Sequence, residues 1–532
     1  MRMNRRIGLF LMALGFFAAG CGEGEKPLPP AWKNTENALH IDVNSPFDSL
    51  SPDVDASGST HVFPLLYSFL FVPSAQGELA PDLALRWEYD PARFSWTIHL
   101  RSDARFHTGL PVTARDVEYS FRLLTAKSRC SLLSSVNRIQ VLSGDTLVFF
   151  LRADDPHFPT KIWDVSILPA PERSGAIDFY SRPVGSGPFR FKGRAGPDGV
   201  ILEANRDYYA GPPEISRIYF HFVKDPETSW RRLLDGKTDL ATELTPQNRR
   251  MMQWIADRFY LNEYVLPYYT LLLYNTHHPL FADPTVRRAL GMAIDRRRIV
   301  DMILEGAGRI ANGPMGVDSP YHDPGAAPLP YDPAGALSLL EAAGWSWNAD
   351  HTTLIKSGVP FSFELRVNGQ SEIEIRVARF ITLCLHRVGI HARLIPTSFS
   401  DIHQRYYCNT DYEVVLTELV GAYRNPESAL DLFSPSSVGE SVAGGFDTPE
   451  VTALIRRALN TGNKNAKKMS FFEVEARINS ISPGVFLYQK TAFDVLSRRL
   501  FLPAPFSGVC EGIYRLRLAR LAPDIASRLG QH

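Results

Sequence analysis

Strand-like and helix-like segments alternate along most of this chain, and that alternation limits the fold more than any other feature. Residues 94–100 alternate apolar and polar side chains at period two, as a half-buried strand does. Residues 145–151 and 217–223 are further strand candidates, rich in aromatic and branched side chains. Helical patterns lie between such segments, so the sequence predicts an α/β architecture.

The predicted helices begin at recognisable capping residues. Thr113, followed three residues later by Asp116, resembles a capping box. Asp283 and Asp332 each stand directly before a proline, which suits the first turn of a helix, and Asp295 is expected to cap a helix that runs to about residue 304. The apolar stripes that follow these caps indicate core packing and not a cofactor site.

The N-terminus has the pattern of an export signal. Arg2, Arg5 and Arg6 precede an apolar stretch at 7–20 that is too short to span a bilayer. The stretch ends in small residues directly before Cys21 and resembles a bacterial lipobox. We therefore expect residues 1–20 to be a lipoprotein signal peptide, Cys21 to carry the lipid and residues 21–30 to form a tether. The alternative is a chance cysteine behind an ordinary signal peptide.

Composition and length limit the kinds of partner and the number of domains to be expected. The chain has 532 residues, with 57 Lys and Arg against 57 Asp and Glu, so its formal charge is zero and a nucleic-acid partner is not expected. Its length suits about three domains or subdomains. No second segment is long and apolar enough to span a membrane.

A connection at 313–330, rich in proline and glycine, is long enough to be either functional or an ordered surface meander.

Four cysteines remain beside the one expected to carry lipid: Cys130, Cys384, Cys408 and Cys510. None forms a C-x-x-C pair, which disfavours zinc ribbons and thioredoxin-like sites. They are either isolated buried thiols or include one or more disulfides. A Cys384–Cys408 bridge is then favoured, because these two are closest in sequence.

No enzyme motif stands out. The chain has no H-E-x-x-H zinc motif, no G-x-S-x-G nucleophile elbow and no P-loop. His277 and His278 are adjacent, and neighbouring strand residues point to opposite faces, so they are not expected to share a metal. We therefore expect no catalytic residue, no metal site and no cofactor.

Four blocks resemble the bacterial extracellular solute-binding proteins of family 5, the peptide- and nickel-type receptors of ABC importers. They carry, in the family's order, a Trp-containing segment, strand, Phe-His-x-Gly turn and helix start at 83–117, a Val-Gly-x-Gly-Pro loop and Asn-x-Asp-Tyr segment at 183–209, a strand end and helix at 275–296, and a helix at 331–345.

This resemblance implies two α/β lobes that enclose a ligand. Lobe I would comprise residues 31–284 and 491–532, with an extra subdomain near 66–180, and lobe II would comprise residues 285–490. Ligand would favour a closed form that a membrane permease and its ATPase recognise. The expected protein is a monomeric, lipid-anchored receptor on the periplasmic side of a bacterial membrane.

One segment departs from the peptide-binding members of the family. In those members a Gly-Trp-x-x-Asp-Tyr-x-Asp-Pro pattern supplies an Asp that pairs with the peptide's α-ammonium. Ala422 stands at that position here, and Leu419 and Asn425 replace the Trp and the second Asp. A buried ammonium without its carboxylate is costly, which argues against ordinary peptide capture through this contact. A shifted alignment would instead let Glu427 fill the role.

Further ligand contacts are expected on the same grounds. Glu418 and Arg424 are new charges near the divergent segment, and Arg424 would suit a carboxylate, a phosphate or a sugar acid, unless it points to solvent. Tyr67, Asn275 and Tyr423 are either cleft-lining contacts or, for the tyrosines, core residues. The expected ligand is an oligopeptide or a related small solute. The alternative is a transport-independent sensor or scaffold for an opine, an oligosaccharide or a metal complex.

Overall fold

The computed structural model describes residues 37–501 and 516–521, apart from internal gaps. These gaps are 45, 48, 53–60, 74–78, 128–134, 153, 156–157, 164, 172–177, 179–181, 197–198, 399–400, 403–410, 421–429, 431–432, 434–447 and 462. The expected signal peptide, Cys21 and the tether at 21–30 lie outside the described residues. So do Cys130, Cys408 and Cys510.

The strands predicted from the sequence are present. They are β5 (Ser95–Leu100), β7 (Thr146–Leu151) and β10 (Arg217–Phe222). β5 and β7 pair with β4 (Ala84–Asp90) and β6 (Val136–Val141) in a four-stranded antiparallel sheet of order β4-β5-β7-β6. Leu147, Phe149 and Leu151 of β7 pack in the core beside this sheet.

The predicted helix caps are also present. The carboxylate of Asp116 accepts hydrogen bonds from the backbone N–H and the hydroxyl of Thr113, at the start of α2 (Ala114–Lys127). Asp283 caps α7 (Pro284–Met292) and Asp332 caps α9 (Pro333–Ala342), each with proline in the first turn. Asp295 caps α8 (Arg296–Arg298), which continues as a π-helical turn at Ile299–Ile303.

A single large sheet runs through the molecule. Its strands follow the order β18-β17-β19-β12-β20-β11-β1-β10-β9-β8, and β13 pairs with β20 beside that path. β12 and β20 span 16 and 14 residues and pair antiparallel along most of their length, with a register shift between Val265 and Tyr269. These strands are β1 (Ala38–Val43), β8 (Phe189–Arg194), β9 (Gly199–Ala204), β11 (Leu240–Ala241), β12 (Phe259–Tyr274), β13 (Gly308–Ile310), β17 (Ser362–Asn368), β18 (His391–Thr397), β19 (Val414–Val420) and β20 (Gly484–Ser497).

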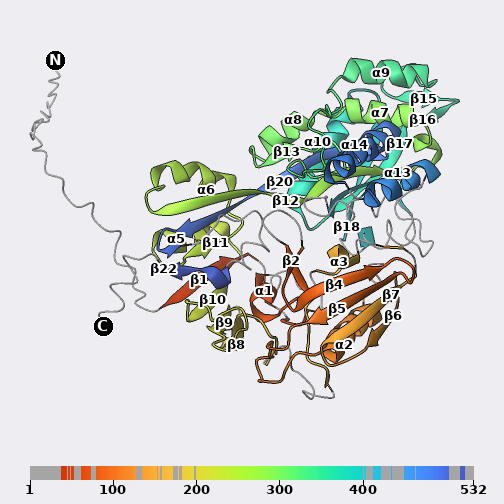
Figure 1. The fold of residues 1–532 in the computed structure, drawn as a ribbon. Helices are drawn as coiled ribbons and strands as arrows, with labels where there is room; N and C mark the ends of the chain where they lie inside the picture. The colour runs from red at the N-terminus through yellow and green to blue at the C-terminus, as the bar shows by residue number, and fades with distance from the viewer. Residues whose placement is uncertain are drawn as a thin grey trace, which may run out of the picture.

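Helices cover both faces of the β17–β19 end of this sheet. One core lies between the sheet and α7, α9 and α10 (Glu372–His386), and a second lies between the opposite face and α13 (Pro449–Leu459) and α14 (Lys464–Ile481). Figure 1 shows these helices together in one body, while β4–β7 and α2 lie in another. β12 and β20 lead from one body to the other, which gives a two-lobed α/β fold.

The apolar cores place the lobe boundary inside the long strands. Tyr274 and Phe281 pack in one core with α7, α9 and α10, whereas Phe259 and Val495 pack with α5 (Pro226–Leu234). The first crossing therefore lies within β12, earlier than the boundary at 284/285 expected from the sequence. A resemblance places blocks along a chain, but the packing of aromatic side chains decides which lobe a strand end belongs to.

The C-terminal end of β20 completes the lobe that holds the N-terminal strand. β11 lies between β20 and β1 in the sheet. Just beyond β20, the Nε of the buried Arg499 lies 3.1 Å from Oδ1 of the buried Asp239. Arg499 also donates to the backbone carbonyl of Ala38. Residues far apart in sequence thus share one ion pair in this core.

Cys384 is buried on α10 and carries a free thiol, which agrees with the alternative of isolated buried thiols and not with a Cys384–Cys408 disulfide. Burial in the helix-packed core raises the pKa of this thiol, which keeps it protonated and unreactive. Within the described ranges, no helix has both the length and the apolar character needed to cross a membrane.

Candidate ligand-binding site

In the helix-rich lobe, β17 and β19 direct their carboxyl ends toward the crossing, the point where β12 and β20 pass from one lobe to the other. The C-terminal part of β12 lies in this lobe. β19 runs antiparallel to it, from Val414 opposite Tyr274 to Val420 opposite Tyr268. β17 is parallel to β19, with Leu365 opposite Val414. The loop after β19 and the loop from β17 into α10 therefore begin at the edge that faces the other lobe.

The N-terminal lobe has the mirrored arrangement. β11 runs antiparallel to β20, with Leu240 opposite Leu496, and both β1 and β10 run in the direction of β11. Their carboxyl ends thus also point toward the crossing. In open α/β sheets, ligands bind outside the carboxyl ends of parallel strands. Two such edges face each other here, so we take the space bounded by them as the candidate site.

Glu243 marks the edge of the N-terminal lobe, directly after β11. Its backbone adopts a left-handed conformation (φ 52°), which is strained for a residue with a β-carbon. Asn44, just beyond β1, donates to its carboxylate at 2.6 Å. The backbone N–H of Glu243 donates to buried Asp494 at 3.1 Å, and Tyr264 donates to the same oxygen. Burial raises the pKa of Asp494 to about 7.

Three charged side chains mark the opposite edge. Glu418 on β19 and Lys490 on β20 form an ion pair with 2.5 Å between Oε1 and Nζ. The hydroxyl of Thr270 on β12 lies 3.5 Å from the same oxygen. Glu374 lies in the first turn of α10 and is 7% exposed. Of these, the sequence singled out only Glu418, because the partners are distant in sequence and carry no local motif.

The sequence-predicted residues separate into three groups. Tyr67 is buried and donates from its hydroxyl to the carbonyl of Leu50, so it belongs to the core of the N-terminal lobe. Asn275 follows β12 at the end remote from the crossing, where its side-chain amide donates to the carbonyl of Tyr412 at 2.9 Å. Only Glu418 lies at the candidate edge.

The remaining predicted residues, Ala422, Tyr423, Arg424 and Asn425, lie outside the described residues. β19 ends two residues before the first of them, with Val420 opposite Tyr268. Tyr268 is 46% exposed at the point where β12 changes lobe. The sequence analysis missed this tyrosine, although an aromatic side chain after a proline inside a strand pattern offers a signal.

A polar contact joins the lobes beside the long strands. α6 (Pro246–Met251) carries Gln247 and Arg250, which lie 2.8 Å and 3.3 Å from the carboxylate of Glu305. Glu305 follows the π-helical turn of the other lobe and has a positive φ of 52°. This contact is partly exposed and is expected to contribute little to stability, which suits a contact that breaks and re-forms.

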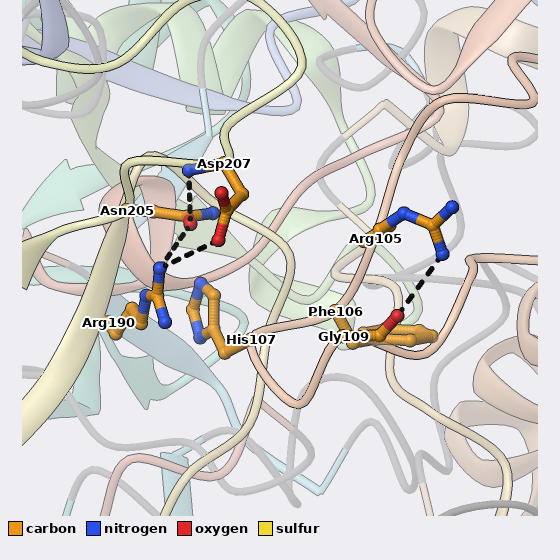
Figure 2. Close-up of a pocket in the computed structure, with 7 residues that line it drawn as sticks. All are labelled: Arg105, Phe106, His107, Gly109, Arg190, Asn205 and Asp207. Atoms are coloured by element: carbon orange, nitrogen blue, oxygen red, sulfur yellow. Dashed lines mark hydrogen bonds and ion pairs between the residues drawn. The ribbon is translucent and has the colours of Figure 1, made fainter.

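A small cavity of about 60 Å³ lies away from these edges, in the N-terminal lobe, and is lined by Arg105, Phe106, His107, Gly109, Arg190, Asn205 and Asp207. Its polar groups are engaged with one another (Figure 2). Arg190 donates to Asn205 and Asp207. The ring of His107 accepts from the N–H of Gly185 and donates to the carbonyl of Gly187.

Burial lowers the pKa of His107 to about 4, so this ring stays neutral. The cavity therefore joins the Phe-His-x-Gly turn to the Val-Gly-x-Gly-Pro loop, and we assign it a structural role. Throughout the described ranges there is no group of three or more His, Cys, Asp or Glu side chains that could hold a metal ion.

The sequence profile of the bacterial extracellular solute-binding proteins, family 5 (middle region), matches residues 78–441. The chain belongs to this family. The oligopeptide-binding protein AppA of Bacillus subtilis is 24% identical over 522 residues, which cover 90% of this chain and 92% of AppA. The nickel-binding periplasmic protein of Escherichia coli is 25% identical over 449 residues, which cover 81% of this chain and 84% of that protein.

Solved structures agree on the fold. NikA of Brucella suis, in complex with Fe(III)-EDTA, superposes with a TM-score of 0.77 at 21% identity and covers 91% of this chain and 100% of its own. The family consists of solute-binding proteins and not enzymes, which confirms the expectation drawn from the absence of catalytic motifs. This family 5 protein is therefore a binding protein with a two-lobed α/β fold.

Proposed function

We propose that this protein encloses a small solute between its lobes and delivers it to an ABC permease and its ATPase. The observation that carries the proposal is the pair of carboxyl strand edges that face each other across β12 and β20. A solute that contacts both edges makes its full set of contacts only when the lobes are closed. Binding then shifts the open–closed equilibrium by the solute's differential affinity for the two states.

The proposed solute is an oligopeptide or a related small molecule. Relatives in the family include proteins named for binding oligopeptides, nickel and heme, so the family's scaffold accommodates varied solutes. Ala422 replaces the expected Asp, and we propose that Tyr423, Arg424 and Asn425 in the same loop contact the solute. Arg424→Ala should then weaken binding of a carboxylate-bearing solute, and unchanged affinity would remove Arg424 from the site.

The first experiment is native mass spectrometry of the full protein purified from its own host. A co-purified mass in the small-solute range identifies the ligand, and adding that solute to emptied protein should reduce the radius of gyration in X-ray scattering. A protein that carries no solute and does not contract with any of a broad solute panel would contradict the proposal. Solute capture without a loss of uptake in a deletion strain would favour the transport-independent sensor.

We also propose that lipid on Cys21 holds the protein at the periplasmic side of a membrane. Cys21→Ser should move the protein from the membrane fraction to the soluble fraction, because the acyl chains provide the anchor. Cys384→Ser is the matched control, since its thiol is buried in the fold. Retention of the Cys21→Ser protein in the membrane fraction would refute the anchor.

A further inference from the structure

Aromatic and arginine side chains lie together at the end of the N-terminal lobe where β12 begins. Trp254 is 78% exposed, and Tyr260, the second residue of β12, is 47% exposed. The guanidinium of Arg498 lies 4.1 Å from the centroid of the Tyr260 ring. Its Nε donates to the carbonyl of Ala256, two residues after Trp254, at 3.0 Å. These contacts hold an indole, a phenol and a guanidinium close together at the surface.

A second pair of the same kind follows directly in the chain. β21 (Leu500–Phe501) pairs with β22 (Arg520–Leu521), and the guanidinium of Arg520 lies 4.6 Å from the centroid of the Phe501 ring. Phe501 is 42% exposed, whereas Leu500 and Leu521 pack in the core that contains β1. Because alternate residues of a strand point to opposite faces, this packing turns Phe501 and Arg520 outward.

Neither arginine is neutralised by an acid within the described part of the chain. Arg498 and Arg520 form no ion pair there, and Asp257, which is exposed in the turn before β12, pairs with neither of them. A guanidinium stacked on a ring keeps N–H groups that can donate to phosphate oxygens. Exposed Trp and Tyr side chains beside basic residues are typical of protein surfaces that lie at the boundary between water and lipid.

This end of the N-terminal lobe is also where the chain enters the fold. Arg499, between β20 and β21, donates to the carbonyl of Ala38, the first residue of β1. The chain from Cys21 to Ala38 is at most about 60 Å long when fully extended, so a lipid on Cys21 would keep this end of the lobe near the membrane. Tyr260 precedes Val265, where β12 reaches the crossing, by five residues of strand, or about 17 Å.

We propose that Trp254, Tyr260, Arg498, Phe501 and Arg520 form a membrane-contact surface that rests on anionic phospholipid headgroups. The inference rests on the proposed lipid anchor and adds a second, non-covalent contact that would set the orientation of the receptor. The aromatic rings would lie at the level of the headgroups, and the guanidinium groups would bind their phosphates. A permease that recognises the closed form has to contact both lobes, whereas every residue of this surface belongs to the N-terminal lobe. The surface therefore suits the membrane itself better than the permease.

Vesicle binding by a protein without lipid measures this contact directly. The mature chain, residues 21–532, is used with Cys21→Ser, so that no acyl chain contributes. It should sediment with vesicles that contain phosphatidylglycerol and much less with vesicles of phosphatidylcholine, and about 1 M salt should release it because salt screens the charges. Lipids brominated close to their headgroups should quench the fluorescence of Trp254, which is the only exposed tryptophan among the described residues.

The variants separate this surface from a general effect of charge or exposed apolar groups. Trp254→Ala should lower vesicle affinity about tenfold, because the indole is its largest apolar group. Arg498→Gln and Arg520→Gln should each lower affinity about fivefold, which corresponds to about 1 kcal/mol for each arginine near an anionic surface. Leu383→Ala on α10 and Arg93→Gln between β4 and β5 are the matched controls, because both side chains are exposed elsewhere on the molecule. Circular dichroism confirms that each variant is folded.

Salt-sensitive binding to the anionic vesicles that is weakened in Trp254→Ala and unchanged in Leu383→Ala supports the proposal. Equal binding by these two variants, or equal binding to both kinds of vesicle, would overturn it. Binding to native membranes but not to protein-free vesicles would assign the surface to a membrane protein instead. A Trp254-dependent dimer in ultracentrifugation, without vesicle binding, would assign it to a second copy of the chain.

Failure of the lipid anchor is recognised separately. If the Cys21→Ser protein stays on native membranes after a high-salt wash, and does so with Trp254→Ala as well, the anchor is refuted. Retention that is lost in high salt and in Trp254→Ala reports the membrane-contact surface and leaves the anchor standing. If the Cys21→Ser protein is soluble and binds no vesicles, the anchor stands and the membrane-contact surface is refuted.

Discussion

Replacing Glu475 by glutamine should loosen the long 313–330 connection from α14. Glu475 is fully buried, and its carboxylate accepts hydrogen bonds from Nδ1 of His322 at 3.0 Å and from the backbone N–H of Asp323 at 2.9 Å. Hydrogen bonds to a charged group contribute about 1.5–3 kcal/mol each, so the loss of the charge should cost about that much. The connection is an ordered surface segment that this carboxylate holds in place.

The expected change in melting temperature follows from the size of the unfolding unit. About 2.1 cal/mol/K per residue gives an unfolding entropy of about 1 kcal/mol/K for a chain of about 500 residues, and hence a decrease of about 1.5–3 °C. If lobe II, with about 200 residues, unfolds by itself, the decrease should be about two and a half times as large. Differential scanning calorimetry resolves both cases.

The pH dependence gives the sharper test. The hydrogen bond to Glu475 raises the pKa of His322. Stability from the charged pair is therefore fully present below the unfolded histidine pKa of about 6.5 and is lost as pH rises through the higher folded value. The wild type should exceed Glu475→Gln in melting temperature more at about pH 5.5 than at about pH 8.5. Equal differences at the two pH values, or the same loss in exposed Glu473→Gln, would refute the reasoning.

Three further predictions concern packing and burial. Gly185→Ala places a β-carbon 1.9 Å from the carbonyl oxygen of Leu66, so calorimetry should show a loss of stability greater than the about 1–3 kcal/mol that overpacking usually costs. Gly144→Ala, whose added β-carbon has no atom within 4 Å, should be tolerated. Equal losses in the two variants would count against this reasoning. Phe281→Ala should cost about 3–5 kcal/mol because the ring is fully buried, and a loss under about 1 kcal/mol in denaturant unfolding would disprove it. The pKa of Asp494 is raised to about 7 by burial, so the folded state retains a proton that the unfolded state releases above about 3.9. Wild-type stability should therefore fall from about pH 4 to about pH 7 and that of Asp494→Asn should not; parallel melting-temperature profiles would contradict this.

Features with a local physical cause could be predicted from the sequence. The caps at Asp283 and Asp332 depend on the residue itself and the proline beside it, and both are present. The strand at 95–100 follows from its alternation alone. The two-lobed fold followed from motifs spread over the chain, because a family's scaffold constrains many positions together.

Features set by distant packing could not be predicted in the same way. The lobe boundary depends on Phe281 and its neighbours joining the helix-packed core, which no local pattern specifies. The ion-pair partner of Glu418, Lys490, comes from an element more than 70 residues later in the chain. Asn275 was placed near a strand end correctly, but only the strand directions reveal that this end is remote from the crossing.

The pairing of β20 with β11 has a consequence for the order in which the protein can be assembled. In the lobe that contains the first strand, β1, the strand β11 pairs with β1 on one side and obtains its second sheet neighbour from residues near position 496. Among the described residues, the cationic partner of buried Asp239 is Arg499. A nascent or truncated chain that stops short of these residues would leave that lobe with an open sheet edge and an uncompensated carboxylate. Because such long-range contacts form slowly, the lobe that begins with β1 can finish folding only after the C-terminal part of β20 and Arg499 have been added.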